Sequence, residues 1–417
     1  MTTVRANAAA CAAIVVLYAV QVWAARDSVQ HGVHALHAAI MIGSGILQSA
    51  ALFALRRAIV GDVLRRVTWL PAVSAAVMLA LSTVCPNTDD DAAAYVGYAK
   101  QPTFGAAYAA PASHFTGNGF EVIPATWPAL PALVYGPLWL AVDRALVGHA
   151  PSYAVALGTL RAFNALLLAA LLLALRRLGC DRATLAVVAL NPMLYFYFIV
   201  QAHNDLGPIV LVVAGAAVAR TRPLLGALIA SGAGLVKIVF VAIAPLAYAG
   251  RCSARRAWAI AAASAVLVAG LSWLFGGAPY VRAMAAVGHT QIATRADAAH
   301  LVATALHLAV AAIALAAIVA AVTRRVFLRA ATFAFSAVSS IIYPWYLGWC
   351  IPYALRVPGF AATFFILLPA LAHLIDPHFS PWPERTFALL VPYYLAVIAF
   401  VVRDVLVARR GRVSASE

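Results

Sequence analysis

Residues 67–85 read Val-Thr-Trp-Leu-Pro-Ala-Val-Ser-Ala-Ala-Val-Met-Leu-Ala-Leu-Ser-Thr-Val-Cys, and residues 86–91 read Pro-Asn-Thr-Asp-Asp-Asp. The first part carries no charge and is long enough, at about 1.5 Å per helical residue, to cross the hydrocarbon of a bilayer. The second part sets three of the chain's 14 acidic residues side by side directly after that run. Charged groups beside a bilayer are costly to desolvate, so this cluster indicates an ion path, a proton relay or a catalytic acid or base. A solvated turn that only caps a helix is the alternative interpretation.

Apolar runs of this kind recur along the whole chain of 417 residues, which is 65% hydrophobic and only 10% charged. A soluble fold with this composition would have too few polar side chains to cover its surface. We therefore predict an all-α, polytopic membrane protein with about 12 to 14 membrane helices, some of them half-length. The first run could also be a signal peptide, but we favour a retained span. The full-length runs are 7–25, 34–55, 67–85, 153–175, 183–201, 256–275, 300–322, 358–375 and 386–402.

The chain has a formal net charge of +15, and its arginines come in small groups between the apolar runs. This distribution argues against nucleic-acid binding, which needs one continuous basic face, and is typical of a topology signal. Because short basic loops stay on the cytoplasmic side, we predict that each loop with a group of arginines is cytoplasmic. Segment 86–152 then lies on the outer side, and 131–147 falls short of a full crossing. The groups are 56–66, 176–182, 220–222, 251–256, 324–329 and 403–412.

Two regions are too short for the two full spans that this topology demands, so we predict broken helices in both. Residues 223–250 would break near Gly232-Ala-Gly-Leu-Val-Lys237, which leaves Lys237 inside the membrane. Residues 331–355 would break at Tyr343-Pro344. Non-helical backbone at that depth is tolerated only where protein or a cavity surrounds it.

The predicted topology divides the chain into three parts. Residues 1–66 form an N-terminal transmembrane hairpin, and 356–417 form a C-terminal hairpin with a basic cytoplasmic tail. Residues 67–355 form the membrane core, in which 86–152 is an outer segment of loops and helices that carries the acidic cluster. The turn His203-Asn204-Asp205 is expected on the same outer side, so the topology brings it towards that cluster.

Several further side chains suit the binding of a charged or sugar-bearing ligand. An isolated arginine in an apolar run is costly, so Arg161 is expected to pair with a carboxylate or with a ligand phosphate. A second outer loop, 276–299, carries Arg295, which could receive an anionic headgroup or simply be solvated. Aromatic residues such as Tyr95 and Tyr135 suit sugar stacking, and suit the headgroup layer equally well. The five cysteines are scattered without metal-ligand spacing and predict neither a disulfide framework nor a metal site.

A set of motifs occurs in a fixed order between about residue 80 and residue 355. Together they resemble the polyprenol-phosphate-mannose-dependent α-(1→6)-mannosyltransferases of bacterial cell envelopes, within the GT-C superfamily. Two departures from that family's pattern stand out, because Asp90 occupies a position that is usually arginine and Ala92-Ala93-Ala94 replaces a more polar stretch. The motifs are Asp91 with Tyr95 four residues later, Tyr135-Gly-Pro-Leu-Trp139, Arg161-x-x-Asn164, His203-Asn-Asp205, a small-residue stretch ending in Lys237, and Tyr343-Pro-Trp-Tyr346-Leu-Gly-Trp349.

The resemblance implies a GT-C-type helical bundle and a transferase of the bacterial inner membrane with its site facing the periplasm. Its partners would be membrane lipids, a polyprenyl-phosphate donor of mannose or another hexose, and a glycan or lipid acceptor. It implies no cofactor beyond that donor; a divalent metal is possible but not indicated. Asp91 would be the base, Asp89 and Asp90 would orient the sugar, and the lipid phosphate would be held by Lys237 and Arg161, with Lys100 and Arg295 as weaker candidates. The other implied substrate-binding residues are Tyr95, Tyr135, His203, Asn204, Asp205, Tyr343, Trp345 and Tyr346.

Two other interpretations stay open at this point. A secondary transporter or a lipid-linked-sugar flippase also has many membrane segments and broken helices. Carriers usually place their coupling charges near mid-membrane and contain repeats, whereas here the acids gather in one outer segment and no repeat is visible. The His203-Asn204-Asp205 turn could also be a simple polar connection, or could hold Arg161 by an ion pair.

Overall fold

The computed structural model describes residues 2–60, 69–248, 251–292, 343–356 and 360–376, with a few isolated positions beyond them. Within these ranges the protein is all-helical and contains no strand, which confirms the predicted fold class. Four helices are long and apolar enough to cross a membrane: Arg5–His31, Ala35–Val60, Tyr153–Arg177 and Ala254–Ala286. A bent pair of helices gives a fifth candidate span. The predicted spans 300–322 and 386–402 lie outside the described ranges.

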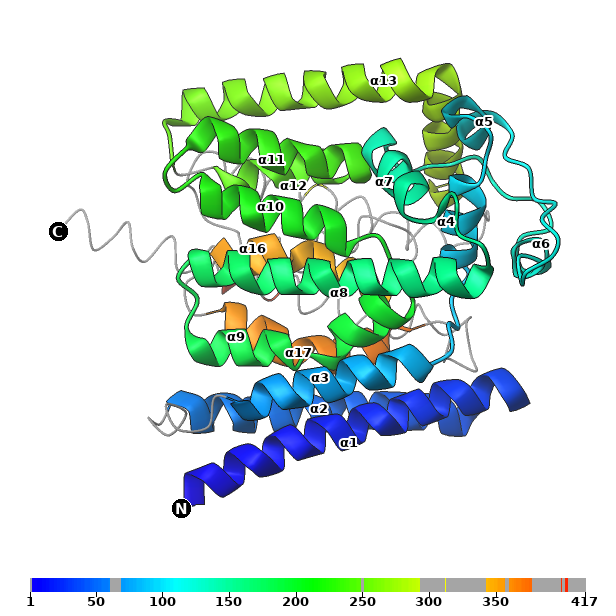
Figure 1. The fold of residues 1–417 in the computed structure, drawn as a ribbon. Coiled ribbons are helices and arrows are strands. Elements are labelled where there is room, and N and C mark those ends of the chain that lie inside the picture. Colours follow the sequence, from blue (N-terminus) through cyan, green and yellow to red (C-terminus); the bar gives the residue numbers. More distant parts are fainter. Residues whose placement is uncertain are drawn as a thin grey trace.

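The helices lie roughly parallel in successive layers (Figure 1). At one edge, α1 (Thr2–His31) packs on α2 (Ala35–Val60) and on α3 (Trp69–Val84). Helix α17 (Ala361–Leu374) packs against α2, although more than 300 residues separate them in the sequence. The N-terminal hairpin therefore packs against a late segment of the chain as well as against its neighbour α3.

The central layers contain α8 (Tyr153–Arg177), α10 (Leu206–Val218) and α11 (Pro223–Val236), with α13 (Ala254–Ile292) covering α11 (Figure 1). Helices α10 and α11 touch at two glycines. A Cβ atom built on Gly215 would lie 2.6 Å from the Gly226 carbonyl oxygen, and one on Gly226 would lie 2.5 Å from that of Gly215. Small residues at a helix contact let the backbones approach closely, as membrane helices require.

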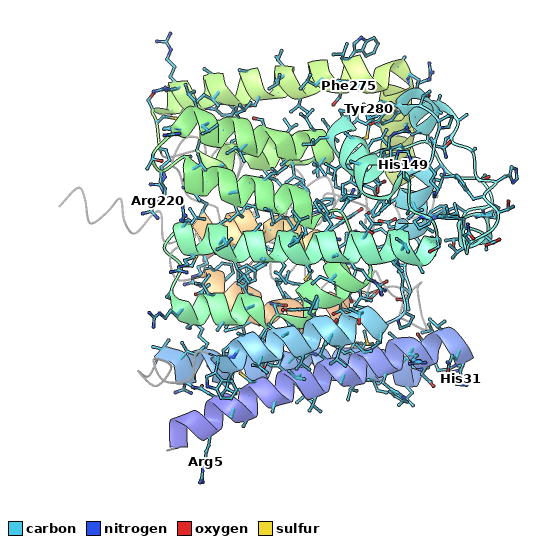
Figure 2. All side chains as sticks on the ribbon, in the orientation of Figure 1. Arg5, His31, His149, Arg220, Phe275 and Tyr280 are labelled. Atoms are coloured by element: carbon cyan, nitrogen blue, oxygen red, sulfur yellow. The ribbon has the colours of Figure 1, made fainter. Side chains whose placement is uncertain are left out.

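Short helices of segment 86–152 gather at one end of the bundle (Figure 1). They are α4 (Asp91–Ala99), α5 (Phe104–Ala109), α6 (Val122–Thr126) and α7 (Pro137–Val147). With 11 residues, α7 is too short to cross a bilayer, in line with the interpretation of 131–147. We call the opposite end, where α8 finishes at Arg176 and Arg177 and where Arg220 lies, the basic end; Figure 2 labels Arg220 there and His149 at the other end.

The chain breaks where proline or the predicted topology requires it. Helix α9 (Arg182–Ala189) and the π-helix η2 (Leu194–Val200) meet at an angle of 51° across Asn191-Pro192, because proline cannot continue the helical hydrogen bonding. Helix α11 ends at Val236 and is followed only by α12 (Phe240–Ile243) and a 3-10 turn, η3 (Ala244–Ala247). After Tyr343 the chain forms the 3-10 helix η5 (Pro344–Cys350) and then α16 (Ile351–Arg356).

One sequence prediction is corrected by the helix boundaries. The outer loop predicted at 276–299 begins as helix, because α13 continues to Ile292 past a kink at Gly277. Gly277 has φ of 57°, a left-handed conformation that glycine adopts without a Cβ clash, so the kink is accommodated there. Arg295, assigned to that loop, lies outside the described residues.

Candidate active site

The acidic cluster forms the start of α4, with Asp91 as its first residue. The Asn87 side-chain oxygen accepts from the Asp89 backbone N–H, and the Asp89 carboxylate accepts from that of Asp91, both at 2.8 Å. The Trp127 indole N–H donates to the Asp90 carbonyl oxygen at 3.0 Å. Carboxylates are favourable at a helix N-terminus, where the unpaired N–H groups and the helix dipole are positive. These contacts fix the turn and the direction in which Asp91 points.

Two phenols hold one oxygen of the Asp91 carboxylate. Tyr95 lies one helical turn further along α4, the spacing that brings side chains together on a helix, and donates to Asp91 Oδ2 at 3.1 Å. Tyr135 donates to the same oxygen at 3.4 Å. Burial, and then the negative charge of Asp91, raise the pKa of both Tyr95 and Tyr135 well above the usual value. Both phenols therefore stay protonated and act as hydrogen-bond donors.

His203 lies between two of the carboxylates, in the turn that joins η2 to α10. Its Nδ1 is 3.3 Å from Asp91 Oδ2, and its Nε2 is 3.5 Å from Asp89 Oδ2. Neither nitrogen meets hydrogen-bond geometry, so these contacts are ion pairs at short distance. Burial lowers the pKa of His203, but the two carboxylates outweigh this and raise the pKa to about 9. The raised pKa favours the imidazolium form at neutral pH, and the ring stacks on Trp345 with centroids 3.7 Å apart.

Among the residues that the structure describes, His203 and the two carboxylates beside it form a group that could hold a metal ion. Asp89, Asp91 and His203 each offer a ligand atom, and these atoms lie within 4.8 Å of one another. A histidine that binds a metal must be neutral, so a cation at this position would have to displace the proton of His203. The sequence expectation of no metal stays a prediction.

Lys237 stands where α11 ends, at its C-terminal cap, with extended backbone. Its ammonium donates to Asp205 Oδ1 at 2.6 Å, and the indole N–H of Trp349 donates to the same oxygen at 2.5 Å. Three aromatic rings surround the ammonium, with centroids 5.3 Å away for Tyr135, 5.4 Å for Tyr346 and 5.0 Å for Trp349. A partly desolvated ammonium in an aromatic cage is stabilised by the negative faces of the rings.

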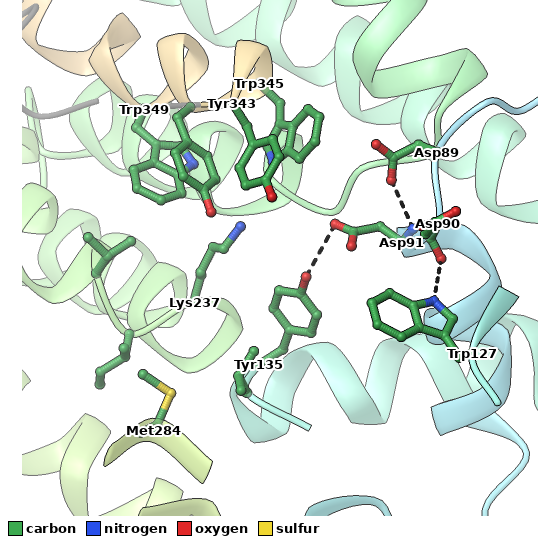
Figure 3. Close-up of a pocket in the computed structure, with 14 residues that line it drawn as sticks. Asp89, Asp90, Asp91, Trp127, Tyr135, Lys237, Met284, Tyr343, Trp345 and Trp349 are labelled. Atoms are coloured by element: carbon green, nitrogen blue, oxygen red, sulfur yellow. Dashed lines mark hydrogen bonds between the residues drawn. The ribbon is translucent and has the colours of Figure 1, made fainter. Parts of the chain in front are cut away.

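The acidic cluster and Lys237 open into one cavity of about 330 Å³ (Figure 3). In the close-up, Lys237 and Asp91 approach it from either side of Tyr135, and the aromatic residues of η5 cover it. Tyr343 and Trp345 stack with ring centroids 4.5 Å apart. The sequence-predicted residues on its wall are Asp89, Asp90, Asp91, Tyr135, Lys237, Tyr343, Trp345 and Tyr346; the others are Trp127, Val134, Ile238, Val239, Met284 and Trp349.

Other predicted residues lie elsewhere. The Arg161 guanidinium donates to the backbone carbonyl oxygens of Val200, Cys85 and Thr83 at 3.0, 2.9 and 3.4 Å, so it ties helix ends together and is not on the cavity wall. Asp205, the possible ion-pair partner of Arg161 in the His203-Asn204-Asp205 turn, pairs with Lys237 instead.

Lys100 and Asn204, two of the expected substrate-binding residues, are also absent from the wall of this cavity. Lys100 donates to the Ala150 carbonyl oxygen at 3.2 Å, lies over the Phe120 ring and lines a different cavity. Asn204 is fully buried, and its amide has no hydrogen-bond partner within the described ranges. Neither residue lines the cavity that contains Asp91.

The sequence interpretation missed Trp349 as a site residue, although it belongs to the quoted Tyr343–Trp349 motif. In a 3-10 helix, side chains three residues apart lie on the same face. Tyr343, Tyr346 and Trp349 have this spacing, and the rings of Tyr346 and Trp349 stack at 4.0 Å. The three-residue spacing in the sequence could therefore have identified Trp349 as a site residue. Trp127 and Met284, in contrast, reach the cavity from segments whose sequences contain no such pattern.

Gly136 lets Tyr135 approach Lys237. Its N–H donates to the Val236 carbonyl oxygen at 2.9 Å, which joins the start of α7 to the end of α11. A Cβ atom at Gly136 would lie 2.1 Å from the Leu235 carbonyl oxygen, a backbone atom that cannot move aside freely.

We expect Gly136→Ala to lower thermal stability markedly, by about 2 kcal/mol or more, because the clash pushes two helix ends apart. The measurement is the melting temperature of the detergent-solubilised protein. Gly158→Ala in α8 is the matched control, since a Cβ there meets nothing within 4 Å and alanine favours a helix. Equal melting temperatures for the two variants would show that the contact at Gly136 is not tight.

The comparisons with known proteins assign the chain to a family. A family model described as "Alpha-(1->6)-mannopyranosyltransferase, N-terminal domain" matches residues 2–251, more than half of the chain. No curated protein and no solved structure gives a match. The matched range contains the acidic cluster, the His203-Asn204-Asp205 turn and Lys237, while η5 lies beyond it. The chain therefore belongs to the α-(1→6)-mannopyranosyltransferase family, and is a membrane glycosyltransferase.

Proposed function

We propose that this enzyme transfers a hexose from a polyprenyl-phosphate carrier to an envelope glycan, lipid or other acceptor. Mannose is the first candidate for that hexose. One observation carries the proposal: the Asp91 carboxylate and the Lys237 ammonium line the same cavity beside stacked aromatic rings. A base, a cation and a sugar-stacking surface are the parts that such a transfer needs.

In the proposed reaction, the acceptor hydroxyl attacks the anomeric carbon of the donor sugar and gives its proton to Asp91. The bond from that carbon to the phosphate oxygen breaks, and the lipid phosphate leaves with the bonding electrons. Lys237 stabilises the negative charge of the leaving phosphate. Because the phosphate is already a good leaving group, the protein mainly supplies position and charge.

The neighbours of Asp91 suit the role of a fixed base. Tyr95, Tyr135 and His203 all approach Oδ2, so we assign Oδ1 to the acceptor hydroxyl. His203 and Asp89 set the charge balance around Asp91, and the stacked pair Tyr343 and Trp345 offers a flat surface to a sugar ring. Asp90 is exposed at the rim and would orient a sugar hydroxyl.

We further propose that the cavity faces the outside of the bacterial inner membrane. The support comes from charge, because arginines of the central helices gather at the basic end, away from the cavity. Arg176 and Arg177 finish α8, and Arg220 follows α10, whereas Asp205 and Lys237 stand at the other ends of α10 and α11. Because basic loops stay on the cytoplasmic side, this distribution supports a cytoplasmic basic end.

The test is to incubate purified enzyme with a panel of radiolabelled polyprenyl-phospho-sugars and a mannan-type acceptor. We expect transfer from the mannosyl donor, and equal transfer after treatment with EDTA, because the proposed reaction uses Asp91 and Lys237 and no metal ion. Transfer from a nucleotide sugar but from no lipid-linked donor would contradict the donor class. Loss of activity with EDTA and recovery with Mn²⁺ or Mg²⁺ would assign Asp89, Asp91 and His203 to a metal.

A further inference from the structure

A second cavity, of about 200 Å³, opens at the basic end of the bundle. It lies where the end of α8, the last turns of α10, η3 and the end of α16 come together. Val212 and Ala216 are 7 and 11 residues beyond Asp205 along α10, about 10 to 17 Å at the rise of a helix. The cavity is therefore separate from the candidate active site, and a ligand bound there would take no part in the proposed transfer; the cytoplasmic position of this end rests on the proposed orientation.

The lining of this cavity combines apolar side chains with two arginines, the exposed Arg251 and the half-buried Arg356, which we call its rim. Its wall carries no carboxylate within the described residues. The nearby Asp181 is already engaged, because its two carboxylate oxygens accept from the backbone N–H and the hydroxyl of Thr184 at the start of α9. The lining residues are Leu178, Gly179, Cys180, Val212, Val213, Ala216, Leu246, Ala247, Arg251, Pro352, Leu355 and Arg356.

We infer that this cavity binds one anionic phospholipid of the membrane, with the phosphate at Arg251 and Arg356 and the upper part of an acyl chain against Val213, Leu246 and Leu355. The charge of the rim is complementary to a phosphate, and guanidinium groups match phosphate geometry by donating two N–H groups at once. The apolar side chains of the lining would not strengthen the binding of a small hydrated anion. They would strengthen the binding of a phospholipid, because they can pack against its acyl chain.

The position of the cavity supports a lipid as the occupant. Basic pockets between membrane helices at the cytoplasmic side are typical sites for anionic headgroups, and the basic end is the one that we propose to be cytoplasmic. Arg220 donates to the Arg177 carbonyl oxygen at 2.7 Å and so adds positive charge close by. The bound lipid would join the ends of α8, α10 and α16, which reach this end of the protein from distant parts of the sequence.

Binding is measured on the full chain in detergent, by titration with short-chain phosphatidylglycerol and, separately, with phosphatidylcholine of the same chain length. We expect phosphatidylglycerol to bind more tightly, and Arg251→Gln and Arg356→Gln each to weaken it about fivefold, since one arginine near a membrane surface contributes about 1 kcal/mol. Arg222→Gln is the matched control, because Arg222 is an exposed arginine at the same end but off the cavity wall; its affinity should change less than twofold. Equal affinity for the two lipids, or equal losses in all three variants, would overturn the inference.

Cys180 supplies a readout of where the lipid binds. It lines the cavity as a free thiol, and the other partly exposed cysteine, Cys252, can be removed as Cys252→Ser. Phosphatidylglycerol should slow maleimide labelling of Cys180 in that variant, whereas inorganic phosphate alone should not. Protection by inorganic phosphate would identify a simple anion site, and labelling that no lipid slows would place the lipid elsewhere. The labelling needs no arginine variant, so a misfolded variant would not leave the inference untested.

Discussion

Asp91→Asn is expected to abolish transfer while leaving the fold intact. Asparagine keeps the shape of aspartate and still accepts from Tyr95 and Tyr135. It cannot take a proton from the acceptor. Loss of a general base costs about 10²- to 10⁴-fold in rate, and the loss should appear in kcat with little change in the donor KM, because the group acts on the acceptor hydroxyl in the transition state.

The control for this experiment removes a charge from the same outer segment without touching the cavity. Glu121 is an exposed acid whose carboxylate accepts from the Gly117 backbone N–H at 2.5 Å, and Glu121→Gln should keep its transfer rate within about threefold, as for surface changes in general. Melting temperatures of both variants exclude misfolding. An Asp91→Asn enzyme with unchanged kcat would remove Asp91 from the mechanism and leave Asp89, the other carboxylate beside His203, as the base to test.

The sequence predicted the parts of this fold that depend on local chemistry. Long apolar runs are enough to predict spans, and a glycine-rich stretch before a lysine is enough to predict a helix that breaks close to Lys237. The meeting of the acidic cluster with the His203 turn followed from counting crossings between arginine groups, because each group must return to the same side. Neither prediction needs knowledge of packing.

The contacts of Arg161 could not be predicted in this way. A buried arginine must satisfy its donors, and an acidic partner or ligand phosphate is the obvious choice from sequence. The protein uses backbone carbonyls at the ends of α3 and η2 instead, which accept hydrogen bonds because helix C-termini leave them unpaired. Only the three-dimensional position of those ends shows this. Asp205 is therefore available to pair with Lys237. The position of His203 between the carboxylates of Asp89 and Asp91 could not be predicted for the same reason, because it too depends on the three-dimensional arrangement.

Lys237→Met is expected to raise the donor KM and to lower kcat, because the ammonium would bind the donor phosphate and then stabilise it as it leaves. A hydrogen bond to a charged group contributes about 1.5 to 3 kcal/mol, so the combined loss in kcat/KM should be about tenfold to a hundredfold or more. Methionine preserves most of the side-chain volume among Tyr135, Tyr346 and Trp349. The measurement is steady-state transfer over a range of donor concentrations.

A structural explanation of the same loss has to be separated from the catalytic one. Asp205 is fully buried, so removing Lys237 leaves a buried carboxylate whose remaining donor is Trp349 within the described residues, and breaking such a pair costs about 3 to 5 kcal/mol of stability. The double variant Lys237→Met with Asp205→Asn removes that uncompensated charge and should recover most of the melting temperature. If Lys237 binds the phosphate, transfer by the double variant stays as low as in Lys237→Met, because the cation is still missing. Recovery of transfer together with stability would mean that Lys237 serves only to neutralise Asp205, and the phosphate would then need another cation, for which Arg295 is the remaining sequence candidate.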